Sequence, residues 1–175
     1  MLTHLTEVIK KHAYELLGRT ETMQLVENLK KTEPELVADA IPGVISYSGL
    51  EKVLRALLKE GVPIRDLGLI LEAIVDAGPN RDPDIITEQV RGRLSRTITR
   101  RFCENGQMRV VTLDAEVEKK ILSALTKNDQ GVYLALSPDV MQQIMTQLGE
   151  LRKKFQELSQ TPIVLTSQVI RVYLS

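Results

Sequence analysis

The sequence predicts a mixed α and α/β fold, with a mostly helical first part and a small, incomplete α/β second part. Up to Phe102, apolar residues recur every three or four positions between short turns, which is the period of amphipathic helices. After Asn105-Gly106, β-branched runs such as residues 108–113 alternate with helical patterns, as they do in α/β proteins. Aromatic residues make up only 3% of the chain, so the cores must be built from Leu, Ile, Val and Ala.

The chain begins with three predicted helices. Apolar residues at helical spacing predict the first over residues 2–17, and Gly18 ends it. Thr20 is the expected N-cap of the second helix, which fades at Lys30. Pro34, at a first-turn position, opens a short third helix that ends before Pro42-Gly43.

Three longer helices follow and form the predicted helical core of residues 46–102. Ser48 with Glu51 is a capping-box signature for a helix that ends at Gly61. Asp66 is the expected N-cap of the next helix, and Asp82-Pro83 opens the longest one. We expect that helix to reach Phe102 unbroken, because apolar residues recur every fourth position along it: Ile86, Val90, Leu94, Ile98 and Phe102.

The second part contains three predicted strands, at residues 108–113, 132–136 and 162–166. Asp114, Ser137-Pro138 and Ser167 mark the starts of the helices between and after them, and the first of these helices is expected to run through Leu125. This alternation predicts a parallel or mixed sheet with right-handed crossovers. The sheet looks unfinished, because no strand follows the last helix.

Composition and charge argue against several classes of protein. The 23 basic and 23 acidic residues balance, so no net field attracts nucleic acid or an anionic membrane. A single cysteine, Cys103, cannot form an internal disulfide and fits a reducing compartment. No apolar run approaches the roughly 18 residues of a membrane span, and the start does not resemble a signal peptide. We expect a soluble, cytosolic chain.

The residues that could carry chemistry have simpler interpretations. His4 and His12 are eight residues apart, whereas two zinc ligands on one helix need a spacing of three or four. His12 falls on the apolar stripe and is expected to be packed. Cys103 has no nearby partner, and the chain contains none of the common phosphate-binding or hydrolase motifs. The sequence therefore predicts no catalytic residue, no cofactor and no metal.

The arginines near the end of the helical part are the strongest candidates for a binding site. Arg93, Arg96 and Arg100 have i, i+3, i+7 spacing and should form one stripe on the long helix. Arginine pairs with carboxylates across an interface better than lysine does. A protein contact, a plain solvated face and, less readily, nucleic-acid binding remain open as interpretations of this stripe.

The nucleic-acid alternative rests on a possible winged helix, in which three helices precede a strand. The helix that follows Asp66 would then enter the major groove. It carries Glu72 and Asp76 and no basic residue, so phosphates would repel it. A winged-helix-like shape used for a protein contact is compatible with these charges, whereas a nucleic-acid-binding module is the less favoured alternative.

Several separated blocks of the sequence resemble one family. They are Gly61-Val-Pro-Ile-Arg-Asp-Leu67, Ile70-Leu-Glu-Ala73, Asp82-Pro83 with Thr87-Glu-Gln-Val-Arg91, Thr3-His-Leu-Thr-Glu-Val-Ile9 and His12-Ala-Tyr-Glu-Leu-Leu-Gly-Arg19. In order and spacing they resemble the cytoplasmic domain of the FlhA family of export-gate proteins, which serve flagella and type III secretion. The resemblance covers essentially the whole chain.

The resemblance implies a larger protein, with a membrane domain and four cytoplasmic subdomains that assemble as a nine-membered ring. Residues 1–31 would be the helical remainder of the first subdomain, residues 32–104 the third, and residues 105–175 a truncated fourth. The membrane would be reached only through a missing N-terminal region, so the chain would lie at the cytoplasmic face of the bacterial inner membrane. No nucleic-acid partner is implied.

The resemblance also implies candidate contact residues. Export chaperones with their cargo bind such proteins in a cleft to which this chain would contribute Thr3. The third subdomain makes much of the ring contact, so we expect acidic and arginine side chains to meet there between neighbouring subunits. The candidates are Arg65, Asp66, Glu72, Asp76, Arg93, Arg96 and Arg100. The expected function is a non-catalytic docking platform and ring-forming scaffold in protein export.

Overall fold

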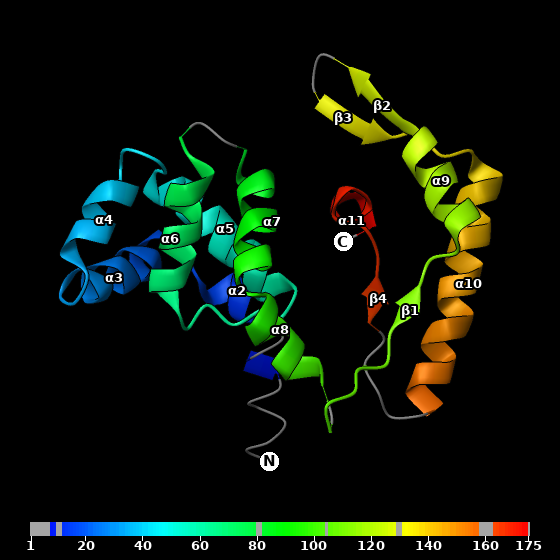
Figure 1. Ribbon diagram of the computed structural model, residues 1–175, viewed down its shortest axis with the longest axis horizontal. Helices are drawn as coiled ribbons and strands as arrows, with labels where there is room; N and C mark the ends of the chain where they lie inside the picture. Colours follow the sequence, from blue (N-terminus) through cyan, green and yellow to red (C-terminus); the bar gives the residue numbers. More distant parts are fainter. Residues whose placement is uncertain are drawn as a thin grey trace. The chain divides into compact units, whose positions relative to one another are not determined.

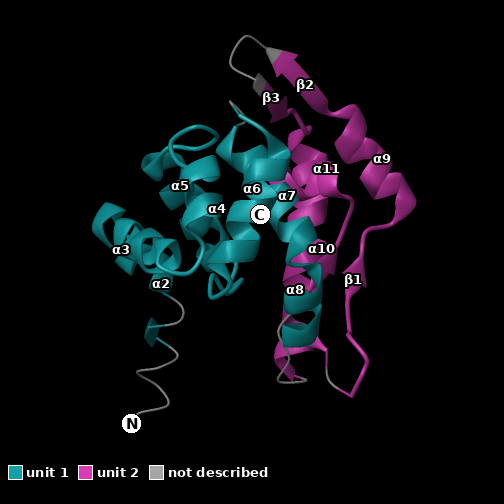
Figure 2. Ribbon diagram, turned by 60° about the vertical axis from the view of Figure 1, so that its left-hand side comes forward, with its two compact units in different colours: residues 1–102 teal, residues 103–175 magenta. Residues whose placement is uncertain are grey.

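The computed structural model describes residues 8–9, 12–79, 82–103, 105–128, 131–157 and 163–174. The chain divides into two compact units, Met1–Phe102 and Cys103–Ser175, shown in different colours in Figure 2. We call them the helical unit and the α/β unit. The second combines helices with two small sheets, so the predicted mixed α and α/β fold class is confirmed. No helix within the described ranges has the length and apolar character needed to span a membrane.

The helical unit consists of helices joined by short turns. They are α2 (Ala13–Leu16), α3 (Arg19–Lys30), α4 (Pro34–Ala40), α5 (Tyr47–Lys59), α6 (Leu67–Ala77), α7 (Pro83–Arg93) and α8 (Ser95–Phe102). The helix predicted over residues 2–17 is helical at residues 8–9 and in α2, and Leu17 is already extended. The rest of that prediction lies outside the described residues.

Helix α6 forms the centre of the helical unit. It packs against α4 on one side and α7 on the other, as Figure 1 shows, and it also contacts α3. Its only exposed side chains are Glu72 and Asp76, and a helix that is apolar over nearly its whole circumference belongs in a core. The surrounding helices complete one apolar cluster, whose fully enclosed members include Val26, Leu50, Val53, Leu54, Leu57, Ile70, Leu71, Ile74 and Val90.

The helix caps confirm two sequence predictions and correct two others. Asp66 accepts a hydrogen bond from Leu69 N at 3.2 Å, and Asp82 accepts one from Asp84 N at 2.8 Å, as expected. The predicted cap at Ser48 is wrong, because α5 begins at Tyr47 and Ser46 Oγ accepts the bond from Gly49 N at 3.1 Å. Thr20 is likewise inside α3, whose N-cap is Gly18.

Helix α5 ends in a Schellman motif. Gly61 has φ +72°, which L side chains rarely adopt. Its N–H donates to Leu58 O at 2.8 Å, and Val62 N donates to Leu57 O at the same distance, so two terminal carbonyls are satisfied. The predicted helix stop at Gly61 therefore has a clear physical basis.

The long helix expected from Asp82 to Phe102 is interrupted at Leu94. Leu94 has φ −81° and ψ 6°, and helix α7 ends before it while α8 begins after it. Leu94 N still donates to Val90 O, and Ile98 N to Leu94 O, both at 2.9 Å, so the interruption is a bend in a nearly continuous ladder. The buried Leu94 holds the bend against the core, since its side chain is only 1% exposed.

The α/β unit contains β1 (Val111–Thr112), α9 (Ala115–Ser123), β2 (Leu125–Asn128), β3 (Gly131–Leu134), α10 (Pro138–Glu157), β4 (Val164–Leu165) and α11 (Gln168–Leu174). Strands β1 and β4 are parallel, with Val111 opposite Val164, and β2 and β3 form an antiparallel hairpin. Its small core is built around Ile121, Ile144 and Ile170, one from each helix. Asp114 caps α9 as predicted, accepting from Glu116 N at 2.9 Å.

The α/β unit differs from the prediction in its strands. Strand β2 was missed, because the pattern of α9 was extended through Leu125, where the chain has already turned into the hairpin. The strands form two separate two-stranded sheets in place of one mixed sheet. Parallel strands, which the prediction included, are present in the pair of β1 and β4, which a long connection containing α9 and α10 links.

Candidate functional site

The candidate site is the arginine-bearing end of the helical unit, where α7 and α8 follow α6. Arg93 closes α7 and lies 3.7 Å from both Glu72 and Asp76 of α6. All three side chains are about half exposed or more, so each ion pair contributes little to stability. Their importance is geometric, because the acidic residues of α6 and an arginine of α7 meet within one chain. From the sequence, such charges were expected to meet between subunits.

Two further arginines reach the end of α5. Arg91 forms an ion pair with Glu60, and Arg101 donates a hydrogen bond to the carbonyl oxygen of Gly61. Glu60 and Gly61 directly follow α5, whose terminal carbonyls carry a partial negative charge that favours cations. The Arg101 guanidinium lies over the Phe102 ring at 5.9 Å. Arg91 and Arg101 therefore hold α7 and α8 onto the rest of the helical unit.

Arg96 and Arg100 behave differently. Both are exposed on α8, one helical turn apart, and neither forms an ion pair or a hydrogen bond with any part of the chain that the structure describes. The stripe predicted on one helix is therefore divided by the bend at Leu94. Arg93, before the bend, pairs with Glu72 and Asp76. Arg96 and Arg100, after the bend, have no partner among the described residues.

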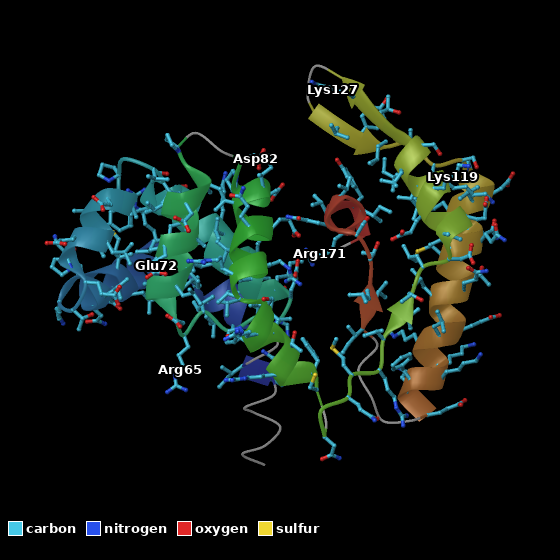
Figure 3. The ribbon with its side chains drawn as sticks, viewed as in Figure 1. Arg65, Glu72, Asp82, Lys119, Lys127 and Arg171 are labelled. Atoms are coloured by element: carbon cyan, nitrogen blue, oxygen red, sulfur yellow. The ribbon has the colours of Figure 1, made fainter. Side chains whose placement is uncertain are left out.

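The remaining candidates have separate positions. Asp66 caps α6, so its carboxylate already has a structural role. Arg65 precedes it in the α5–α6 turn, is exposed and points away from the helices (Figure 3). Thr3, the predicted contribution to a chaperone cleft, lies outside the described residues. These observations do not test the assignment of the candidate residues to an interface, which stays a prediction.

The histidine and cysteine side chains form no catalytic arrangement among the described residues. His12 was expected in the apolar stripe, but its side chain is 46% exposed and bonds Glu15 at 2.9 Å. That bond, and then one from the Tyr14 hydroxyl, hold the pKa of the Glu15 carboxyl below its usual value. The bond to Glu15 raises the pKa of Tyr14. Cys103 is a half-buried free thiol, and the described ranges contain no metal-binding group of three or more suitable side chains.

Some contacts in this region have no signal in the pattern of the sequence. The pairing of Arg91 with Glu60 and of Arg101 with Gly61 joins residues 31 and 40 positions apart, which no periodicity reveals. The bend had a local signal in Gly92, because glycine weakens a helix interior by about 1 kcal/mol relative to alanine. The uninterrupted apolar spacing through Phe102 outweighed that signal.

Comparisons with known proteins agree with this architecture. Flagellar biosynthesis protein FlhA of Bacillus subtilis (strain 168) is 40% identical over 174 residues, which cover 98% of this chain and 26% of the relative. The chain thus spans about a quarter of the length of the curated relatives it matches. The nucleic-acid alternative gains no support from these relatives.

Solved structures share the fold. The Chlamydia pneumoniae CdsV protein has a TM-score of 0.84 and 30% identity, over 98% of this chain and 50% of that one. Nonameric EPEC SctV-C has a TM-score of 0.75 and 23% identity, over 91% of this chain and 56% of that one, which shows a likeness of fold. The FHIPEP family model matches residues 1–175, the whole chain, and the chain therefore belongs to the FHIPEP family.

Proposed function

We propose that this chain is a non-catalytic docking and ring-forming part of a bacterial protein export apparatus of the flagellar and type III secretion class. The observation that carries the proposal is the match of the entire chain to the FHIPEP family, together with 40% identity to a flagellar biosynthesis protein. The longer protein would act at the cytoplasmic face of the inner membrane. Residues 1–31, 32–104 and 105–175 would belong to its first, third and fourth cytoplasmic subdomains.

The ring part of the proposal depends on the helical unit. Its surface presents Arg96 and Arg100 without a partner among the described residues, and arginine suits carboxylate recognition between proteins. A protein of the same fold, SctV-C, has been solved as a nonamer. We infer that this chain also contributes to a ring of copies of the longer protein, a nonamer.

The docking part of the proposal concerns export chaperones, their cargo and other export proteins. Thr3 would contribute to the cleft that receives them, and motion between subdomains would open or close that cleft. This part rests on the family resemblance. The helical unit would supply the fixed scaffold, because Ile98 of α8 packs against its buried core and Arg101 bonds the carbonyl oxygen of Gly61.

A chain exchange tests the proposed function. The 174 matching residues of Bacillus subtilis FlhA are replaced by the corresponding part of this chain, and flagellar protein export and swimming are measured. We expect export to be restored to a substantial fraction of the parental level, since the fold and the exposed site are kept. The amount of chimera in the membrane is measured in parallel. A chimera that is present at the parental level and exports nothing contradicts the proposal.

A further inference from the structure

The pairing of charges inside the helical unit leaves two surfaces of opposite sign unengaged. Arg93 lies 3.7 Å from both Glu72 and Asp76, and Arg91 pairs with Glu60, so each of these groups already has a partner of opposite charge within the chain. On α8, Arg96 and Arg100 remain exposed without a partner among the described residues. On α4, Glu35 and Asp39 remain in the same condition.

The two pairs have the same spacing. Arg96 and Arg100 are four residues apart on α8, and Glu35 and Asp39 are four residues apart on α4. Residues four apart on a helix lie on one face, with Cβ atoms about 6 Å from each other. Two helices placed side by side can therefore form two arginine–carboxylate bridges at once. This match of sign and spacing distinguishes the α4 face from an arbitrary acidic patch.

In the isolated chain, the repulsion within each like-charged pair also destabilises the helix that carries it. Like charges at i, i+4 destabilise a helix by about 0.2–0.5 kcal/mol. A partner of opposite charge removes that repulsion on both helices and adds the attraction between them. The arginine guanidinium is well suited to this, because its planar fork binds carboxylates with two hydrogen bonds.

The two faces cannot satisfy each other within one helical unit. Helix α4 packs against α6, α6 against α7, and α7 against α8, so two helices separate α4 from α8 (Figure 1). A contact between the faces must join two molecules. Because the donor and acceptor surfaces differ, the contact can repeat head-to-tail, which gives a closed ring or an open filament.

We propose that the α8 face with Arg96 and Arg100 docks on the α4 face with Glu35 and Asp39 of a second copy of this chain. The inference rests on the proposed ring function and names the two surfaces that meet. It differs from the contact first expected from the sequence, in which α6 supplies the acids, because Glu72 and Asp76 already have Arg93 as a partner inside the chain.

The test is a charge exchange between the two faces in the complete 175-residue chain. One variant carries Arg96→Glu and Arg100→Glu, and a second carries Glu35→Arg and Asp39→Arg. Association is measured by sedimentation equilibrium at about 20 mM salt, where the Debye length is about 20 Å. We expect each variant to associate about tenfold or more weakly than the parent, because two attractions become repulsions.

Mixing the two variants gives the decisive result. In the mixture each α8 face again meets an α4 face of opposite charge on the other variant, so association should return to within about threefold of the parent. The chain with all four substitutions should do the same. A matched control with Arg19→Glu and Lys52→Glu, two exposed side chains on α3 and α5, makes the same change in net charge as the α8 variant and should leave the association constant unaltered.

The alternative outcomes are distinct. If only the α8 variant weakens association, and mixing does not restore it, the arginines dock elsewhere and this inference fails while the proposed function stands. A parent chain that stays monomeric at its highest soluble concentration also overturns the inference. The inference is also overturned if the α8 variant keeps its self-association and loses binding to a nucleic-acid polyanion. The proposed function is tested separately, by measuring protein export in the Bacillus subtilis FlhA chimera.

Discussion

The two units differ in how much apolar side chain they enclose. In the helical unit, helices α3 to α7 all contribute to one cluster around α6, and many of its members have no measurable exposure. Among the described residues of the α/β unit, the core is limited to Ile121, Ile144 and Ile170. Apolar side chains such as Met145 and Val169 are 62% and 58% exposed there.

The difference shows which unit can hold a binding surface by itself. Burial of apolar surface is the main favourable term in folding, and local opening is easiest where few buried contacts exist. The helical unit has the larger core and should present the α4 and α8 faces in a fixed geometry. The α/β unit should open at lower free energy.

Matched core truncations give the largest expected effects and test this contrast. Ile70→Ala removes a side chain with no exposure from the centre of α6, and should lower the opening free energy of the helical unit by about 2–5 kcal/mol. Ile144→Ala removes a side chain that is 7% exposed, and should lower the opening free energy of the α/β unit by about 2 kcal/mol or less. Hydrogen exchange resolved by segment measures both values.

Exposed apolar residues supply the controls for the core truncations. Ile85→Ala in the helical unit and Val169→Ala in the α/β unit change side chains that are 49% and 58% exposed. Each should alter the opening free energy of its unit by about 0.5 kcal/mol or less. The contrast between the units is wrong if Ile144→Ala costs as much as Ile70→Ala.

Cap removal gives an intermediate effect and compares equivalent features in the two units. Asp66 caps α6 and Asp114 caps α9, each through one carboxylate–amide hydrogen bond. Asp→Ala at either cap should lower the local opening free energy by about 1 kcal/mol. In the helical unit, removal of the cap should not increase hydrogen exchange in the other helices. In the α/β unit, the increase in hydrogen exchange should extend to α10 and α11. Equal local effects without that spread would indicate that the α/β unit is as robust as the helical one.

The smallest expected effect concerns the exposed Glu15. Its pKa is lowered by the bond from His12 and, to a lesser degree, by the bond from Tyr14. A lowered pKa means that the ionised carboxylate stabilises the fold above the pKa of the unfolded chain, and this contribution is lost as pH falls through the folded pKa. His12→Ala should therefore raise the pKa of Glu15 more than Tyr14→Phe does. NMR titration of the Glu15 carboxyl carbon measures both, and the reverse order would contradict the assignment.

Local signals in the sequence were sufficient for most of the helical unit. Helix α4, the caps at Asp66 and Asp82 and the stop at Gly61 depend on residues within one turn, so a pattern of a few residues determines them. The bend at Leu94 depends on how the amphipathic segment of α7 and α8 packs against the core of the helical unit. Apolar spacing alone cannot distinguish a straight helix from one that bends while keeping its apolar face buried.

The strands and the site depended on longer-range contacts. Strand β2 is stabilised by its antiparallel partner β3, and the sequence around Leu125 fits the end of a helix almost as well. The arginines were recognised from their residue type and spacing. Which of them lacks a partner could be learned only from the fold, because the partners of Arg91 and Arg101 directly follow α5 and those of Arg93 lie on α6.

The most direct test of the central claim is the assembly state of the FlhA chimera that carries this chain. Arg96→Glu and Arg100→Glu are introduced into its cytoplasmic part, and the mass of the assembly is measured by native mass spectrometry. Arg19→Glu and Lys52→Glu serve as the matched control. We predict that the ring is lost in the first variant and kept in the control, while hydrogen exchange in the core of the helical unit is unchanged in both. A ring of unchanged mass after reversal of Arg96 and Arg100 would contradict the claim that this face joins neighbouring subunits.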